Sequence, residues 1–299
     1  MKFKYFKYQH KGDVYRDALL SNGFTLDSKD PDFILIDRDA YISNAHEPRK
    51  QLLMYPNVPV ILYPHSPLPL WWYDGLVPLR DYIKCAFVIG EGQKIAMQKI
   101  EPRLRVETSG WGWSELVPFK KPERIRKVLF APAHPTQGLL RPEAKEANRA
   151  IFEELKNHKH LEVTVRYMGD LEAQGLEYDY RFKMVEGRAS GRSVELERSD
   201  LVIAEGTMMY LAVARGKPTI GFGQQHALRP NKDPDKYIPH NWQKYGGDIA
   251  YPLNFGDAPF LQLVEQAQTE QSDWKRDFIG EQMNPVEFAR KVREVMNER

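Results

Sequence analysis

The stretch SDLVIAEGTMMYLAVARGKPTIGFG, residues 199–223, decides the fold. Residues 201–204 are a continuous apolar run, which is typical of a short strand covered on both faces. A turn that contains glycine follows, and the next apolar residues predict a helix over 207–215. Gly216 ends that helix, and residues 218–222 predict a second buried strand. A strand, a helix and a second strand in this order predict a parallel sheet.

The same alternation recurs along most of the chain and predicts an α/β fold throughout. We expect further strands at residues 3–6, 32–37, 58–63, 85–90, 104–110, 161–170 and from 127 onward, with one more at 248–252. We expect helices at residues 13–20, 92–100, 141–157, 258–268 and 285–297, and a polar helix or loop at 186–198. In such sheets ligands bind beyond the carboxyl ends of the strands.

Length and local composition predict two domains. The chain has 299 residues, which suits two domains of about 150 residues each. Residues 118–127 are charged, contain prolines and lack apolar periodicity, so we expect the linker there. The predicted domains are therefore residues 1–120 and 121–299.

The composition excludes several classes of protein. A net charge of +2 does not by itself indicate a nucleic-acid-binding protein. The one cysteine, Cys85, excludes an internal disulfide and any cysteine-rich metal site. The first residues do not resemble a signal peptide, and no run approaches the roughly 20 apolar residues of a membrane span. We expect a cytoplasmic protein without a transmembrane segment.

Three segments resemble one superfamily, the GT-B-type glycosyltransferases. SDLVIAEGTMMYLAVARGKPTI, from Ser199, resembles their donor-site segment; LFAPAHP, from Leu129, resembles the strand that opens the donor domain; LYPHSP, from Leu62, resembles the HGTP loop of the acceptor domain. The similarity is greatest to the CDP-glycerol glycerophosphotransferase and UDP-N-acetylglucosamine 2-epimerase-like families. The resemblance implies two Rossmann-like domains facing each other across a cleft. Residues 1–120 would hold the acceptor and 121–299 the nucleotide donor, with the last helix (285–297) packing back on the N-terminal domain.

The resemblance implies an enzyme that transfers a sugar or glycerophosphate from a nucleotide-activated donor to a hydroxyl acceptor. The nucleotide diphosphate is then a substrate and no cofactor is required. The acceptor stays open among polysaccharide, teichoic-acid-like polymer, lipid-linked sugar, protein and modified DNA. Two alternatives are a UDP-sugar epimerase and a non-catalytic nucleotide- or glycan-binding module. The module is favoured by one departure from the family pattern, because residues 208–213 lack the acid that often binds the donor ribose.

The turn Glu205-Gly206-Thr207 is the predicted diphosphate site. A helix N-terminus offers unpaired backbone N–H groups and roughly half a positive charge. Gly206 lets a phosphate approach the backbone, Thr207 can cap the helix or donate its hydroxyl, and Glu205 can accept from ribose or sugar hydroxyls. The structural alternative is an ordinary turn glycine, an ordinary N-cap and a solvated acid.

Five polar residues at other strand ends complete the predicted site. His65 is the candidate general base, because histidine titrates near neutrality and a hydroxyl nucleophile must lose its proton. His134 and Arg166 are candidate ligands of the donor phosphates, and Gln224 and Gln225 of the donor sugar. Each has a structural alternative, as a loop residue bonded to the backbone or a solvated strand end.

An Asp-x-Asp pair, Asp37 and Asp39, follows an apolar strand. It imitates the divalent-cation site of the other glycosyltransferase class, GT-A, whose two acids bind a metal on the nucleotide diphosphate. The two-domain organisation and the later donor-like segment argue against that class. The expected site therefore contains no metal, and metal binding at this pair is a minority alternative.

Overall fold

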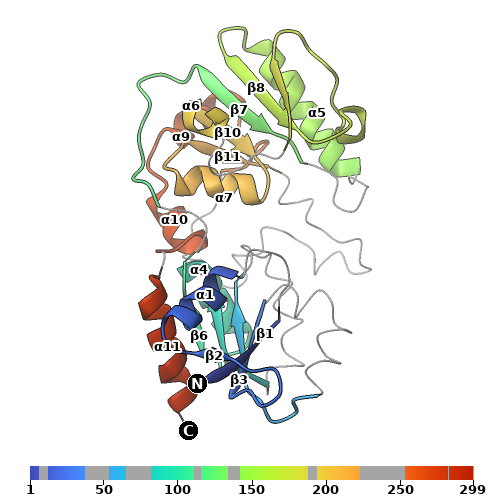
Figure 1. The fold of residues 1–299 in the computed structure, drawn as a ribbon. Coiled ribbons are helices and arrows are strands. Elements are labelled where there is room, and N and C mark those ends of the chain that lie inside the picture. Colours follow the sequence, from blue (N-terminus) through green and yellow to red (C-terminus); the bar gives the residue numbers. More distant parts are fainter. Residues whose placement is uncertain are drawn as a thin grey trace. The chain divides into compact units, whose positions relative to one another are not determined.

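The computed structural model describes residues 1–6, 13–37, 54–64, 82–110, 116–133, 142–187, 194–222, 253–281 and 283–298. The chain divides into two compact units (Figure 1). Unit 1 comprises Met1–Glu115, Asn241–Ile249 and Lys275–Arg299, and unit 2 comprises Leu116–His240 and Ala250–Trp274. Each unit is built around one parallel sheet, and the fold class predicted from the sequence, α/β with two Rossmann-like domains, is confirmed.

The sheet of unit 1 has the strand order β2-β1-β3-β4-β5-β6, and all its pairings are parallel. Its strands are β1 (Lys2–Phe6), β2 (Thr25–Leu26), β3 (Phe33–Asp37), β4 (Val60–Tyr63), β5 (Ile83–Val88) and β6 (Val106–Thr108). The order is that of a doubly wound sheet of the flavodoxin type with one added strand. The short edge strand β2, whose two residues are exposed, is not predicted by the apolar pattern.

The sheet of unit 2 has the order β11-β10-β7-β8-β9, again entirely parallel. Its strands are β7 (Lys127–Ala131), β8 (Glu162–Tyr167), β9 (Lys183–Glu186), β10 (Leu201–Ala204) and β11 (Thr219–Gly221). Counted from β7, this is the 3-2-1-4-5 order of a mononucleotide-binding sheet. The direction of winding reverses between β7 and β10, so this pair is the topological switch point.

The helices follow the predicted pattern with two exceptions. They are α1 (Asp13–Ser21), α4 (Glu91–Ile100), α5 (Pro142–Asn157), α6 (Val194–Arg198), α7 (Thr207–Ala214), α9 (Phe260–Ala267), α10 (Ser272–Phe278) and α11 (Pro285–Asn297), with a 3₁₀ turn η4 (Glu172–Gln174). Helix α10 was not predicted. The polar stretch at 186–198 contains α6, while the strand expected at 248–252 lies outside the described residues.

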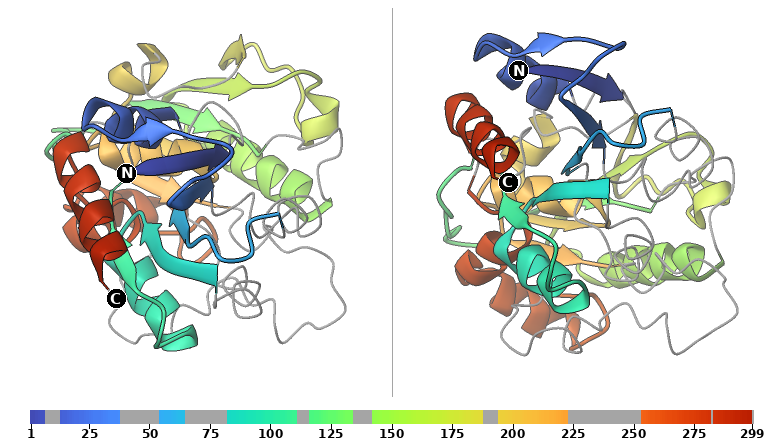
Figure 2. Two further views of the ribbon diagram at one scale, coloured as in Figure 1. Left: turned by 60° about the horizontal axis from the view of Figure 1, so that its bottom comes forward. Right: turned by 90° about the horizontal axis from the view of Figure 1, so that it is seen from below.

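The C-terminal helix α11 belongs to unit 1 (Figure 2). Its Phe288 is buried, with its ring centroid 5.2 Å from that of Tyr15 on α1 and 4.8 Å from that of Phe87 on β5. Asn284 caps the helix by accepting from the backbone N–H of Glu287 at 2.8 Å, and Pro285 occupies the first helical position. The last helix therefore contributes core residues to the N-terminal sheet.

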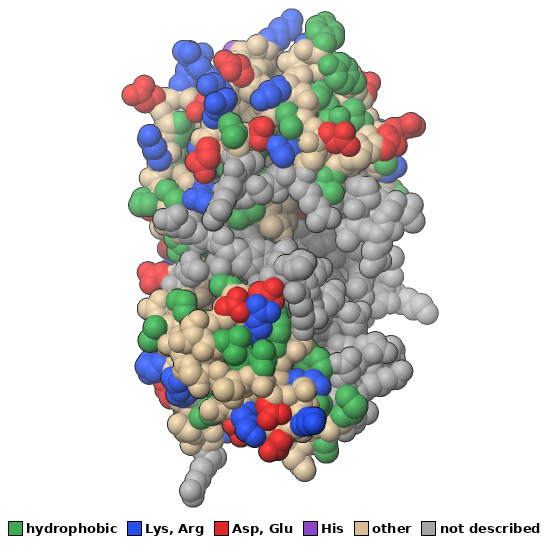
Figure 3. Space-filling model, viewed as in Figure 1, with side chains coloured by type: hydrophobic (Ala, Val, Ile, Leu, Met, Phe, Trp, Pro, Cys, Tyr) green, Lys and Arg blue, Asp and Glu red, His purple; other side chains and the backbone are tan. Residues whose placement is uncertain are grey.

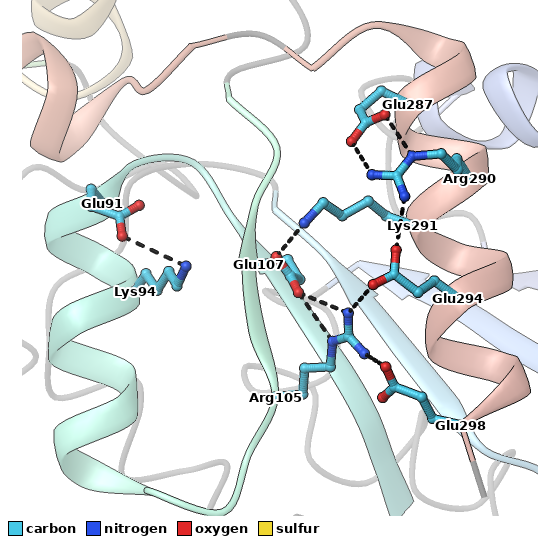
Figure 4. Close-up of polar contacts among 9 residues, drawn as sticks. All are labelled: Glu91, Lys94, Arg105, Glu107, Glu287, Arg290, Lys291, Glu294 and Glu298. Carbon is cyan, nitrogen blue, oxygen red and sulfur yellow. Dashed lines mark hydrogen bonds and ion pairs between the residues drawn. The ribbon is translucent and has the colours of Figure 1, made fainter.

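Charged side chains of both signs cover the surface of both units (Figure 3). One group of them joins α11 to the edge strand β6 (Figure 4). Glu107 on β6 accepts from Lys291 Nζ at 2.8 Å and from Arg105 Nε at 3.0 Å, and Arg105 also pairs with Glu294 and Glu298. Although burial opposes the charge of Glu107, its bonds to Lys291 and Arg105 lower the pKa of its carboxyl. The cluster fastens α11 to the edge of the sheet.

Candidate functional site

The turn at residues 205–207, which we call the donor turn, joins β10 to α7. All four residues of β10 are buried, Glu205 and Gly206 are half-buried, and Thr207 is exposed. Residues 208–214 are buried without exception, since α7 is apolar on every side and packs against β10 and β11. The exposed part of this segment is therefore confined to the turn and the first residue of the helix.

Gly206, and not Thr207, is the N-cap of α7. Its backbone, at φ 58° and ψ −130°, lies in a region that only glycine adopts readily, and it provides no side chain to cap the helix. Thr207 is the first helical residue, which corrects the capping role proposed for it. No heavy atom lies within 4 Å of the position that a Cβ at Gly206 would occupy. The N-terminus of α7 thus has no side-chain cap and has open space beside its glycine.

The donor turn lies at the switch point of the sheet. Strands β10 and β7 are paired in register, with Ala204 beside Ala131 at their carboxyl ends. The residues that follow Ala131, as far as Ala133, are therefore neighbours of the donor turn. Mononucleotide-binding sheets take their ligands at this position.

A buried polar network, which the sequence analysis missed, holds the loops at this edge. Asn148 on α5 is fully buried; its Oδ1 accepts from the N–H of Ala133 at 2.9 Å, and its Nδ2 donates to the carbonyls of Ala133 and Gln174. Gln174, also fully buried, donates to the carbonyls of Met168 and Asp170. The available signal was an asparagine within the apolar stripe of a predicted helix.

Arg166 is engaged by a carboxylate. It is the penultimate residue of β8, and its Nη1 donates to Glu195 Oε2 on α6 at 2.8 Å. Both side chains are largely buried, with exposed fractions of 17% and 16%. A donor phosphate would have to compete with Glu195 for this guanidinium, so the geometry of the donor turn does not depend on Arg166.

The corresponding edge of unit 1 carries a cluster of tyrosines. Tyr63, the last residue of β4, donates its hydroxyl to Tyr5 at 3.4 Å, and Tyr5 donates to Asp13 at 3.3 Å. Burial raises the pKa of Tyr5 to about 12, which keeps this phenol protonated as a donor. The sequence analysis did not single out these residues, although Tyr63 lies two positions before His65.

The structure thus brings together Glu205, Gly206 and Thr207 and places Arg166 on a separate strand. The other predicted site residues, His65, His134, Gln224, Gln225 and Asp39, lie outside the described residues, as does the side chain of Asp37 at the end of β3.

Two searches of the described residues were negative. No helix in this part of the chain is long and apolar enough to cross a membrane. In the same ranges, no three His, Cys, Asp or Glu side chains are grouped as potential metal ligands.

No protein-family model and no curated protein sequence matches the chain. Among solved structures it is similar to a TarM mutant from S. aureus in complex with Fondaparinux, α-GlcNAc-glycerol and UDP, with 12% identity over 88% of this chain and 52% of that chain and a TM-score of 0.41. It is similar to a UDP-forming α,α-trehalose-phosphate synthase from Burkholderia xenovorans (11% identity, 97% and 80% covered, TM-score 0.47) and to the glycosyltransferase SnogD from Streptomyces nogalater (14%, 95% and 75%, 0.41). The chain spans about half the length of TarM. TM-scores below 0.5 do not by themselves establish a common fold, so the fold assignment rests on the two sheets described above.

Proposed function

We propose that the chain is a transferase that binds a nucleotide-activated sugar, or a CDP-glycerol-like donor, at the donor turn and transfers the activated group to a hydroxyl acceptor. One observation carries the proposal: an uncapped helix N-terminus with an open glycine lies at the switch point of a mononucleotide-type sheet. The resemblance of residues 199–220 to the donor segment of GT-B enzymes supplies the class of donor.

The donor turn offers three kinds of interaction to a diphosphate. Backbone N–H groups of the first turn of α7 can donate to phosphate oxygens, and the helix dipole favours the negative charge. Gly206 leaves space for close approach, and the exposed Thr207 can donate its hydroxyl. Glu205 is placed to accept from ribose or sugar hydroxyls. No metal ion is required by this arrangement.

The acceptor is assigned to the carboxyl edge of the sheet in unit 1. In the proposal His65, two residues beyond the tyrosine pair Tyr5 and Tyr63, removes the proton of the acceptor hydroxyl. His134, Gln224 and Gln225 remain proposed donor contacts. A non-catalytic binding module is the second candidate, because α7 contains no acidic residue to bind the donor ribose.

The test changes one exposed residue so that stability and binding move in opposite directions. Thr207→Glu adds an acid to the first turn of α7, which should stabilise the helix by about 0.3–1 kcal/mol. The same carboxylate would repel a diphosphate at the turn, so UDP or CDP affinity should fall about tenfold or more. Affinity for uridine and cytidine should stay unchanged, because the nucleosides do not use the turn.

Two controls accompany the titration calorimetry. Thr207→Gln has a neutral side chain of similar size, and Val286→Glu adds the same charge to the first turn of α11, where Val286 is 65% exposed. Neither should alter diphosphate binding. If Thr207→Glu binds UDP and CDP as tightly as Thr207→Gln, the turn is only a connection. Incubation with nucleotide sugars and CDP-glycerol then separates the functions: slow donor hydrolysis indicates a transferase, an isomerised sugar an epimerase, and binding alone a module.

A further inference from the structure

A hollow of about 920 Å³ lies at the opposite edge of the sheet in unit 2, where its strands begin. We call it the amino-edge hollow. It is bounded by the linker, by the segment before β10 and by the segment after α7. Its lining residues are Val117, Pro118, Lys120, Pro122, Glu123, Arg124, Arg126, Lys127, Glu162, Glu197, Arg198, Ser199, Asp200, Arg215, Gly216, Lys217 and Pro218. The volume is within the range of pockets that bind small molecules.

The hollow is built by the linker, residues 117–126, which is fastened at both ends. At one end the N–H of Val117 donates to the carbonyl of Ala214 at 2.7 Å, and the N–H of Lys120 donates to the carbonyl of Gly216 at 3.1 Å. At the other end Asp200 Oδ2 accepts from the backbone N–H groups of Arg126 and Lys127, at 2.9 and 2.8 Å. Between these ends the linker forms a wall of the hollow instead of packing flat on the sheet.

Cations exceed acids around the hollow. Seven lining side chains are basic and four are acidic, an excess of three within one hollow of a chain whose whole net charge is +2. One acid, Asp200, is already committed to two backbone N–H groups. Figure 3 shows Lys and Arg side chains gathered over the part of unit 2 that carries α6 in Figure 1.

The basic side chains at the hollow differ from most others in being unpaired. In the described part of the chain no ion pair is formed by Lys120, Arg124, Arg126, Lys127 or Arg198. Elsewhere, by contrast, the basic residues of the surface are neutralised by nearby carboxylates, as at Arg16, Arg105, Lys156, Arg181 and Arg290. Unpaired basic side chains that converge on one hollow are what a multiply charged anion requires.

Lys217 lies at the inner wall of the hollow. Its Nζ donates to the carbonyls of Glu197 at 2.7 Å and Ser199 at 3.0 Å. Burial lowers the pKa of this ammonium, and the neighbouring Lys120 lowers it further, against the opposite effect of Glu197 and Asp200. A bound anion would relieve the repulsion between the two lysines.

We propose that the amino-edge hollow is a second anion site, distinct from the donor turn, that binds a ligand carrying two or more phosphate groups. The phosphates would contact Lys120, Arg124 and Arg126 from the linker and Arg198 from the end of α6. Two sources share this chemistry: a free oligophosphate compound and a stretch of a phosphodiester chain.

The experiment removes three linker cations and compares the result with an equal loss of charge elsewhere. The test variant is Lys120→Gln, Arg124→Gln, Arg126→Gln, whose side chains are exposed. The control variant is Lys99→Gln, Arg149→Gln, Lys159→Gln, which are also exposed and away from the hollow. Both are made in the full chain carrying Thr207→Glu, so that binding at the donor turn does not contribute. The probes are inorganic tripolyphosphate and a single-stranded DNA 12-mer.

The test variant should bind a probe at least about tenfold more weakly than the control, the equivalent of one charge-assisted hydrogen bond. For the DNA probe, the slope of log affinity against log salt should fall by about 2, since each neutralised phosphate of a single strand contributes roughly 0.7. Loss of tripolyphosphate binding identifies a free oligophosphate, and loss of DNA binding alone identifies a phosphodiester chain. Equal affinities of the two variants, or no binding of either probe to the Thr207→Glu chain, would overturn the proposal. Should the triple variant unfold, Lys120→Glu alone provides the same comparison against Lys159→Glu.

Discussion

Helix α7 has a glycine at each end, and the two glycines differ in what surrounds them. Both have a positive φ, 58° at Gly206 and 67° at Gly216. A Cβ at Gly216 would lie 2.2 Å from the carbonyl oxygen of Pro118, whereas a Cβ at Gly206 would meet nothing within 4 Å. Backbone conformation selects glycine at both ends, but only at Gly216 does packing require it as well. The carboxyl edge of the sheet is therefore open at its glycine, and the amino edge is covered there by the linker.

Gly216 also completes a Schellman motif. Its N–H donates to the carbonyl of Val213 at 2.9 Å, and the N–H of Lys217 donates to that of Ala212 at 3.0 Å. The motif ends α7 at the point where the linker crosses it. The same residue type thus terminates the helix at one end and leaves backbone N–H groups accessible at the other.

The largest effect should come from Gly216→Ala. A left-handed conformation costs a non-glycine residue roughly 1–2 kcal/mol. Displacing the Pro118 backbone should add about 1–3 kcal/mol. Gly206→Ala should lose only the backbone term, since its surroundings are empty. Urea unfolding of both variants measures the difference, and equal losses would break the comparison between the two ends.

Asn148→Ala should have the next largest effect, at the carboxyl edge. It leaves the buried N–H and carbonyl groups of Ala133 and the carbonyl of Gln174 without their partner, at a cost of about 2–3 kcal/mol. Amide hydrogen exchange should rise around residues 131–133, beside the donor turn. Arg149→Ala, the exposed neighbour on α5, is the control and should stay within about 0.5 kcal/mol. Equal effects of the two variants would mean that the loop is held by other contacts.

Asp200→Ala tests the fastening of the linker at the amino edge. Two backbone N–H groups lose their acceptor, so we expect a loss of about 1–2 kcal/mol. Asp200→Asn retains a carbonyl oxygen in the same place and should lose less. Exchange of the amides of Arg126 and Lys127 reports the local release. If Asp200→Asn and Asp200→Ala are equally destabilised, the hydrogen bonds are not the reason.

The smallest effect concerns the segment that runs from the end of β8 back to the start of β9. There the Arg181 guanidinium, which bonds both oxygens of Asp179, lowers the pKa of that carboxyl to about 2. A lowered folded-state pKa adds stability above the unfolded value of about 4, and this is lost as the pH falls through about 2. The difference in urea midpoint between wild type and Asp179→Asn should therefore shrink as the pH falls through this window. Asp257→Asn, at an exposed position, is the control, and a constant difference for Asp179→Asn would contradict the assignment.

The sequence predicted elements wherever burial leaves a period or a continuous run. Strand β10 is wholly apolar because both faces of its sheet are covered, and α11 follows its predicted bounds because a capping asparagine precedes its apolar stripe. The edge strand β9 reads KMVE with exposed ends, and no alternation distinguishes it from a loop. The same limit explains the missed β2.

Local chemistry also identified the donor turn before any geometry was known. A buried strand, a glycine, a hydroxyl residue and an apolar helix follow one another along the chain, so Glu205, Gly206 and Thr207 are necessarily adjacent. Arg166 shows the limit of such reasoning. Its position near a strand end was correct, but its partner Glu195 lies 29 residues away in sequence and is brought near by the fold.

Sequence alone determined that this is a parallel α/β chain with a phosphate-compatible turn, because both properties are written in contiguous residues. The tertiary structure decided which strands are neighbours, and so placed the switch point between β7 and β10. It also decided that Gly216 is enclosed by Pro118 while Gly206 is open, and that unpaired basic residues from the linker and α6 share one hollow. Strand order and packing depend on contacts between residues far apart in the chain, and no local period records them.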